Sequence, residues 1–213
     1  MSGRIITARH GRPNLSRDLT ISSREYAAWW RAYEASGLHP DEEPPAALIR
    51  LADKAKIVVS STLPRAIETA RELTSAARAI PADPVFVEAP LPPPPAPSWV
   101  KLSPGKWGVI SRFLWFFGYA PAGVESSRQA WRRVDDIVER LGDYAKEGDV
   151  LLCAHGFLNW MIDWKLKRAG WRRTQSDGGH HYWSWRIYET ASQNETAPAA
   201  KAANEKNAPA IAE

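Results

Sequence analysis

The sequence predicts an α/β fold: a three-layer α/β/α sandwich with a mostly parallel central sheet. Short aliphatic and β-branched runs recur along the chain, and segments with helical apolar spacing separate them. Strands that alternate with helices pair in parallel, and the helices cover both faces of the sheet. A length of 213 residues is ample for one domain and short for two. We therefore expect one catalytic domain over residues 1–190 and a tail.

The first elements are a strand and a helix. Residues 4–8 form a short apolar strand, and the turn-rich segment 11–14 leaves its end exposed to solvent. Ser22 or Ser23 can cap a helix that ends near Gly37, because serine favours helix starts and glycine favours helix ends.

The middle of the chain repeats this pattern. A helix is expected over residues 45–54 and a β-branched strand over 57–60. Pro64 then starts another helix, since proline suits the first helical turn. Residues 85–88 read as a third strand, and residues 126–144 carry apolar side chains at the 3–4 spacing of a helix.

The last third completes the sheet. Residues 150–154 are a buried strand, residues 157–167 an apolar helix and residues 182–188 an alternating last strand. The proline run at 90–97 must be extended or a loop, because proline lacks an N–H. Residues 191–213 have almost no large apolar side chain, so we expect a disordered tail.

The segment 107–123 is the most apolar part of the chain. Arg112 interrupts it, and the uninterrupted part is shorter than the roughly 20 residues of a membrane-spanning helix. Its aromatic residues indicate either a core helix, a lid or wall for an apolar substrate, or a protein contact.

Composition excludes several classes of protein. The chain is 44% hydrophobic and 24% charged, as folded proteins are, and its net charge of +4 is scattered. We therefore expect no nucleic-acid partner and favour a small anionic substrate. Cys153 is the single cysteine, which rules out an internal disulfide. The N-terminus does not read as a signal peptide, so the expected compartment is the cytoplasm.

Charged and polar residues follow the ends of the predicted strands. Arg9 and His10 follow the first, Arg65 the second, Glu88 the third and His155 the fourth. In a parallel sheet these ends meet at one edge, where ligands bind. Cations that neutralise phosphoryl oxygens, a nucleophile and an acid for the leaving group are what phosphoryl transfer needs.

Four motifs, in this order, resemble those of the histidine phosphatase superfamily, also called the phosphoglycerate mutase-like family. They are Thr7-Ala8-Arg9-His10-Gly11, Ser60-Ser61-Thr62-Leu63-Pro64-Arg65-Ala66-Ile67-Glu68-Thr69-Ala70, Val124-Glu125-Ser126 and Ala154-His155-Gly156. The resemblance implies that His10 attacks phosphorus and that Arg9, Arg65 and His155 hold the phosphoryl oxygens. Gly156 in the last motif, and Arg12 and Asn14 in the turn-rich segment after the first strand, are also expected to contact the substrate.

The proton donor is the open assignment within this resemblance. Glu88 stands where the family usually has its acid, although Ala89 and a proline run follow it; Glu125 is the alternative. His10 must be neutral to attack, and nearby arginines favour its neutral form. His155, beside the phosphate, is expected to be cationic.

These residues predict a phosphatase that acts on a small phosphomonoester without a cofactor or metal. Alternatives are a mutase that returns the phosphoryl group to a second hydroxyl and a catalytically silent phosphate-binding protein. Asn159 stands where a cysteine-dependent phosphatase needs arginine, which disfavours Cys153 as nucleophile. His180 and His181 would point to opposite faces of a strand and cannot readily share a metal ion. Substrate identity and oligomeric state stay open.

Overall fold

A six-stranded sheet, with strand order β4-β3-β6-β1-β8-β7, organises the fold. The structure is a computed structural model that describes residues 3–190. The strands of this sheet are β1 (Ile5–Arg9), β3 (Ile57–Ser61), β4 (Ala82–Asp83), β6 (Val150–Ala154), β7 (Trp171–Asp177) and β8 (Trp185–Thr190). The first four pair in parallel, whereas β8 and β7 add an antiparallel edge. The predicted mostly parallel sheet is confirmed.

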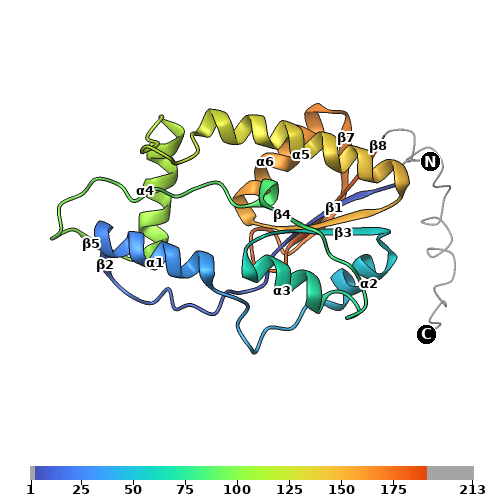
Figure 1. The fold of residues 1–213 in the computed structure, drawn as a ribbon, viewed down its shortest axis with the longest axis horizontal. Helices are drawn as coiled ribbons and strands as arrows, with labels where there is room; N and C mark the ends of the chain where they lie inside the picture. The colour runs from blue at the N-terminus through green and yellow to red at the C-terminus, as the bar shows by residue number, and fades with distance from the viewer. Residues whose placement is uncertain (1–2, 191–213) are drawn as a thin grey trace, which may run out of the picture.

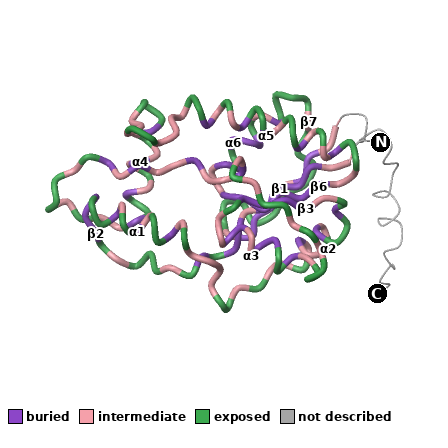
Figure 2. The backbone as a smooth tube through the Cα atoms, in the orientation of Figure 1, coloured by how far each residue is buried: buried purple, intermediate pink, exposed green. Residues whose placement is uncertain are grey.

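Helices cover both faces of the sheet, as the sequence predicts (Figure 1). Helices α5 (Ser127–Glu147) and α6 (Gly156–Arg168) pack on one face and share an apolar cluster with β1 and β6. Helices α2 (Ala46–Lys54) and α3 (Pro64–Glu72) pack on the other face in a second cluster. The central strands between these layers are buried (Figure 2). This is the three-layer α/β/α arrangement.

The longest helix, α5, shows how the sequence specifies its elements. Val134, Ile137 and Leu141 are fully buried and lie on one face, as their spacing predicts. At its start, Ser126 and Gln129 form a capping box that satisfies backbone N–H groups.

A second group of elements forms a lobe beside the sheet (Figure 1). It consists of α1 (Ser23–Ala35), α4 (Pro104–Phe116) and a two-stranded sheet of β2 (Ile21–Ser22) and β5 (Lys101–Leu102). Tyr26, Trp29, Tyr33 and Trp107 form its apolar cluster. We call this group the α1–α4 lobe.

Most expected helices are present, including the Ser22 cap of α1. The apolar segment 107–123 contributes to α4, whose Trp107 and Trp115 are buried. No helix among residues 3–190 is long and apolar enough to cross a membrane.

The expected strand at 85–88 is wrong. Strand β4 ends at Asp83, and a 3-10 turn, η1 (Pro84–Phe86), follows it. Pro84 has no N–H to continue the ladder, and the Asp83 side chain accepts a hydrogen bond from the backbone of Val85 at 2.8 Å. Residues 90–97 have no regular secondary structure, as predicted.

The C-terminal part differs from expectation in two ways. Strand β8 begins at Trp185 rather than Tyr182, and β7 was not predicted. Strand β7 is an edge strand whose residues are nearly all exposed, so it lacks the alternating apolar signal. His180 and His181 lie in the turn between these strands, not in a strand. The expected tail at 191–213 lies outside the described residues.

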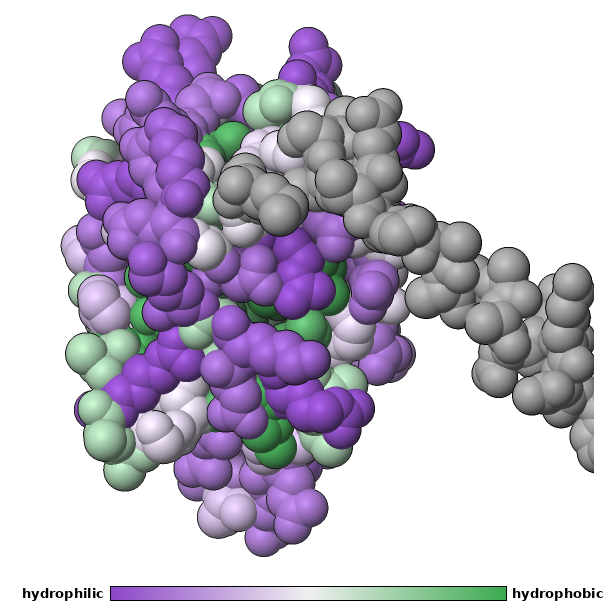
Figure 3. All heavy atoms as spheres, turned by 90° about the vertical axis from the view of Figure 1, so that its right-hand side faces the viewer, coloured by the Kyte–Doolittle hydropathy of each residue, from purple (hydrophilic) through white to green (hydrophobic). Residues whose placement is uncertain are grey.

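The end of the molecule opposite the α1–α4 lobe is mostly hydrophilic over the part that Figure 3 shows. The large apolar side chains with the greatest exposure gather instead on or near α4: Trp99, Val109, Phe113 and Phe117. The two ends of the protein therefore present different surfaces.

Candidate active site

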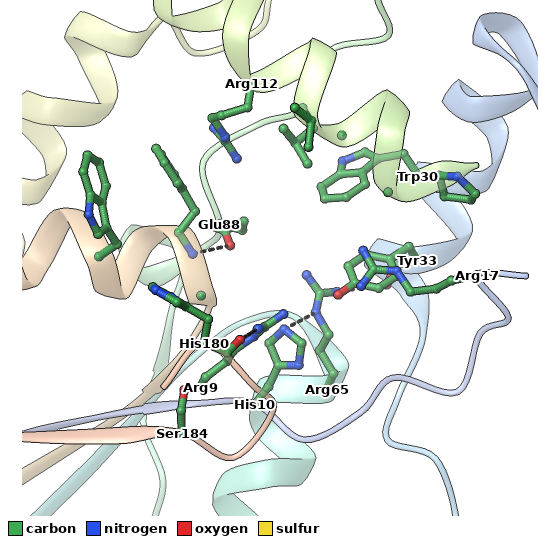
Figure 4. Close-up of a pocket in the computed structure, with 18 of the residues that line it drawn as sticks. Arg9, His10, Arg17, Trp30, Tyr33, Arg65, Glu88, Arg112, His180 and Ser184 are labelled. Carbon is green, nitrogen blue, oxygen red and sulfur yellow. Dashed lines mark hydrogen bonds between the residues drawn. The ribbon is translucent and has the colours of Figure 1, made fainter. Parts of the chain in front are cut away.

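A cavity of about 570 Å³ lies between the sheet and the α1–α4 lobe. Its floor is at the carboxyl ends of β1 and β6, where Arg9, His10 and Gly156 line it. Arg65 and Glu88 line it as well, so the structure brings five of the eight predicted site residues to one cavity (Figure 4). His155 lies directly behind His10, with 5.2 Å between the ring centroids.

His10 is held in one orientation. Its backbone N–H donates to the Ala154 carbonyl at 2.9 Å, which ties the residue after β1 to the end of β6. Nδ1 lies 2.7 Å from the carbonyl oxygen of Gly11, and Nε2 accepts a hydrogen bond from Nε of Arg65 at 3.3 Å. The proton is therefore assigned to Nδ1 and the lone pair to Nε2.

The surroundings of His10 favour its neutral form. Its pKa lies well below the usual value because burial penalises the charged ring, and the cations Arg65, Arg9 and Arg17 lower the pKa further. The expectation of a neutral His10 agrees with this environment.

Arg65 is fully buried at the start of α3. Its Nη1 donates to the carbonyl oxygens of Tyr33 at 2.9 Å and Glu34 at 3.3 Å, and its guanidinium lies 4.6 Å from the centre of the Tyr33 ring. Burial lowers the pKa of Arg65 from its usual value. Arg65 therefore joins His10 to the end of α1.

His155 lies in surroundings that favour its neutral form. It is fully buried, and its Nε2 lies 2.8 Å from the Ser61 hydroxyl at the end of β3. Burial first, and then the charges of His10 and Arg65, hold its pKa well below the usual range. A cationic His155 beside a bound phosphoryl group stays a prediction.

Arg9 and Gly156 form a close pair. Arg9 donates to the His180 carbonyl and lies over the Tyr182 ring at 4.5 Å, while its buried Nε has no hydrogen-bond partner within residues 3–190. A Cβ on Gly156 would stand 3.1 Å from that Nε. The missing side chain of Gly156, at the start of α6, therefore leaves room for the Arg9 guanidinium.

Glu88 and Glu125 occupy different environments. The Glu88 carboxylate lines the cavity and accepts backbone N–H bonds from the start of α6, at 3.1 Å from Phe157 and 2.8 Å from Leu158. Glu125 does not line the cavity; both its oxygens bind Arg133 at 2.8 Å. Of the two candidate acids, Glu88 alone faces the cavity.

Arg12 and Asn14 are not brought to the cavity. Arg12 is exposed and its Nε pairs with Glu42 at 3.0 Å. Asn14 is exposed, and its backbone N–H donates to the Gly37 carbonyl at 2.9 Å. The structure gives neither side chain a position from which to contact a ligand in this cavity.

Sequence reasoning missed several cavity residues. Arg17 and Arg112 supply further cations, and the aromatic wall comes from α1 and α6: Tyr26, Trp29, Trp30, Tyr33, Phe157 and Trp160. Arg112 was visible as the charge that interrupts an apolar segment. The aromatic residues were visible as well, but their spacing is equally typical of core packing.

The residues that could serve as a cysteine nucleophile or as metal ligands are arranged less favourably. Cys153 is buried in β6, and burial raises the pKa of its thiol to about 12. Over residues 3–190, no group of three His, Cys, Asp or Glu residues is arranged to hold a metal ion.

Comparisons with known proteins identify the family. Solved structures that resemble the chain include a mycobacterial glucosyl-3-phosphoglycerate phosphatase (TM-score 0.56, 20% identity, 88% of this chain and 90% of that one). Another is a protein described as mycobacterial hydrolase 1 (TM-score 0.54, 21% identity, 87% and 88%). These likenesses show a shared fold, and no curated protein matches the sequence. Residues 42–198 match the sequence profile of the histidine phosphatase superfamily, branch 1. The chain therefore belongs to the histidine phosphatase superfamily.

Proposed function

We propose that the protein hydrolyses a phosphomonoester through a phosphohistidine on His10. The observation that carries this proposal is the orientation of His10, whose Nδ1 faces the Gly11 carbonyl while Nε2 faces Arg65 in the cavity. A neutral imidazole with its proton on Nδ1 and its lone pair on Nε2 is a competent nucleophile once the phosphoryl group replaces Arg65 as the partner of Nε2. Arg65 and Arg9 stand beside it to bind phosphoryl oxygens.

In the first step, Nε2 attacks phosphorus, a P–N bond forms and the P–O bond to the alcohol breaks. The two arginines stabilise negative charge on the non-bridging oxygens. Glu88 gives a proton to the departing oxygen. Its Oε2 accepts one hydrogen bond, from Phe157, and so retains a position for that proton.

In the second step, water attacks the phosphohistidine. Glu88, now a carboxylate, takes a proton from that water, the P–N bond breaks and its electron pair returns to Nε2. Inorganic phosphate leaves, and the starting state is restored. A covalent intermediate divides one difficult displacement into two easier ones.

The proposal includes a small phosphorylated substrate and no metal ion. The cationic side chains around His10 supply the charge that a metal would otherwise provide. The cytoplasm is the proposed compartment, for which the single buried cysteine is suitable.

The test is hydrolysis of 4-nitrophenyl phosphate in buffer that contains a chelator, with acid-labile phosphate on the protein measured after a rapid quench. We expect turnover and labile phosphate for the wild type, and neither for His10→Ala. His39→Ala is the matched control, because His39 lies outside the cavity. Equal turnover of His10→Ala and wild type, or an absolute requirement for added metal, would contradict the proposal.

A further inference from the structure

The part of the cavity that receives the leaving group is lined by aromatic and apolar residues. Tyr26, Trp29, Trp30 and Tyr33 line it from α1, and Leu91 and Val109 line it as well. In Figure 4, Trp30 and Tyr33 border the open space between His10 and α4. The nucleophile is thus at the floor, and an ester oxygen in line with it would lead the alcohol into this aromatic space.

The rings of α1 already stack on one another. Trp30 and Tyr33 have centroids 5.2 Å apart at an interplanar angle of 24°, and Trp29 and Tyr33 have centroids 5.2 Å apart at 21°. Two guanidiniums also lie over rings that line the cavity: Arg65 over Tyr33 at 4.6 Å and Arg112 over Phe157 at 3.9 Å. A flat π-system in this space meets ring faces and cations that both favour it.

The part of the cavity wall that α4 contributes includes two glycines, which have no side chains. Gly105 and Gly108 of α4 line the cavity, and a Cβ on Gly105 would have no heavy atom within 4 Å. Glycine within a helix is less favourable than alanine. The space beside Gly105 is open on the cavity side of α4, whereas at Gly108 an added Cβ would contact Tyr26 and Leu91. We call the open space beside Gly105 the slot.

A polar group near this slot lacks a partner. The buried Tyr26 hydroxyl has no hydrogen-bond partner within residues 3–190, and it stands 3.7 Å from where a Cβ on Gly108 would be. An unsatisfied buried hydroxyl is costly, which points to a ligand at this place.

The polar side chains of the cavity are mainly cationic. Five arginines line it, together with Glu88, His10, His180 and Ser184, and among its described lining residues there is no asparagine, glutamine, aspartate, threonine or lysine. Such a lining suits an anionic phosphoryl group and a flat ring that stacks on guanidiniums and aromatic faces.

From these observations we infer that the substrate is the phosphomonoester of an alcohol that carries an aromatic ring, with the ring in the slot beside Gly105. This inference rests on the proposed function and deepens it. The phosphoryl group lies on the His10 floor, and the ring supplies the binding free energy that selects this ester over a sugar or glycerol phosphate.

The experiment compares kcat/KM for three esters of primary alcohols: 2-phenylethyl, 2-cyclohexylethyl and glycerol phosphate. These alcohols are chosen because leaving-group reactivity then differs little. We expect the phenylethyl ester to exceed glycerol phosphate by at least about tenfold, as apolar pockets discriminate. It should exceed the non-planar cyclohexylethyl ester roughly threefold to tenfold, which is the contribution of ring stacking.

A matched pair of variants tests where the aromatic ring of the substrate binds. Gly105→Leu fills the slot and should lower the preference for the phenylethyl ester over glycerol phosphate by roughly tenfold. Gly142→Leu places the same side chain on α5, where a Cβ also has open space but no cavity is lined, and should preserve the preference. Trp30→Ala, which removes part of the aromatic wall, should act in the same direction as Gly105→Leu.

The possible failures are distinguishable. If glycerol phosphate or the cyclohexylethyl ester is hydrolysed as well as the phenylethyl ester, or if Gly105→Leu leaves the preference intact, the aromatic substrate class is wrong while phosphatase activity stands. If none of the three esters and no 4-nitrophenyl phosphate is hydrolysed, the proposed function fails first, and this inference fails with it.

Discussion

The protonation state of His10 follows from two contacts and from its burial. The Gly11 carbonyl occupies Nδ1, Arg65 faces Nε2, and burial excludes the water that would stabilise a charged ring. A histidine in water has a pKa of about 6.5 and would be partly charged at neutral pH. Here the same residue is kept neutral with its lone pair on Nε2, beside Arg65, which is the form that the proposed attack on phosphorus requires.

Nuclear magnetic resonance can test this protonation state. In a long-range ¹H–¹⁵N spectrum, we expect Nδ1 of His10 to be protonated and Nε2 unprotonated from pH 7.5 down to pH 5.5. Burial and Arg65 hold the pKa of His10 well below the usual range, so the ring stays neutral across this window. His10→Asn assigns the signals. An imidazolium spectrum for His10 at pH 6, or a proton on Nε2, would contradict this assignment.

Gly156 lacks the side chain that would crowd the Arg9 guanidinium. Gly156→Ala places a Cβ 3.1 Å from Nε of Arg9 and must displace the guanidinium. We expect kcat/KM to fall roughly tenfold, because small displacements of a phosphoryl-binding group are costly. Folding stability should stay equal or rise by about 0.5–1 kcal/mol, since alanine favours helix.

Gly142→Ala is the control for this change. Gly142 lies within α5 with no heavy atom within 4 Å of an added Cβ. It should gain similar stability in urea unfolding and keep wild-type kcat/KM. Loss of stability in Gly156→Ala, with activity reduced only in proportion, would mean that Gly156 is structural rather than an accommodation of Arg9.

At the scale of elements, the turn η1 and the start of α6 hold each other in place. Arg133 of α5 donates to the carbonyls of Val85 at 2.6 Å and Val87 at 2.9 Å, and Glu125 fixes Arg133. Glu88 then caps α6, whose own N-cap, His155, provides no side-chain cap. Glu125 thus acts on the site through Arg133, whereas Glu88 faces the cavity.

These two environments predict different effects of removing each carboxylate. Glu88→Gln removes the proposed acid, so kcat for an alkyl phosphate should fall by about 10²–10⁴, the usual contribution of general acid catalysis. The loss for 4-nitrophenyl phosphate should be far smaller, because its leaving group needs little protonation. Glu125→Gln should lower both rates by a similar small factor.

The readout is the ratio of the two rates in each variant. A leaving-group-dependent loss in Glu125→Gln, with equal losses in Glu88→Gln, would reverse the assignment of the acid. Unfolding in urea gives the second measurement: both variants should lose on the order of 1 kcal/mol, since each replaces a carboxyl oxygen that accepts hydrogen bonds by an amide NH₂ that cannot accept them. Stability alone therefore does not separate the two residues, but the rate ratio does.

What the sequence predicts about elements depends on how local the signal is. Helices α1 and α5 follow from serine caps and apolar spacing that lie within each segment. Strand β7 is polar and exposed, and it becomes a strand only because β8 pairs with it. The Glu88 segment reads as a strand by its residues, yet Pro84 and the cap of Asp83 make it a turn. Strand β7 was therefore missed because its own residues carry no strand signal, and the Glu88 segment was misread because the local turn signal of Asp83 and Pro84 was overlooked.

The site residues likewise differ in whether local sequence signals identify them. His10, Arg65 and His155 follow buried strands, and a parallel sheet brings such ends together without any knowledge of side-chain packing. Arg17, Arg112 and the aromatic wall come instead from the α1–α4 lobe, whose position over the sheet is a long-range property. Arg12 and Asn14 also follow β1, a few residues after His10, but contacts with Glu42 and Gly37 hold this segment outside the cavity.

For the molecule as a whole, two buried histidines at the centre of the fold couple its stability to pH. Burial lowers the pKa of both His10 and His155, whereas in the unfolded chain each has the ordinary value of about 6.5. As pH falls through that value, the unfolded chain binds protons that the folded chain does not, so the free energy of unfolding decreases. The slope approaches about 1.4 kcal/mol per pH unit for each histidine.

The free energy of unfolding should therefore decrease between pH 7 and pH 5.5 in both proteins, but by about 1 kcal/mol less in His10→Asn than in the wild type. The variant lacks one of the two histidines that take up a proton only on unfolding. The measurement is urea unfolding at several pH values in buffer without phosphate, since phosphate would bind the folded state and add stability. The comparison ends at pH 5.5 so that carboxylates contribute little. Parallel pH profiles for His10→Asn and wild type would mean that His10 takes up a proton as readily in the folded protein as in the unfolded chain, and its proposed role as a neutral nucleophile would lose its physical basis.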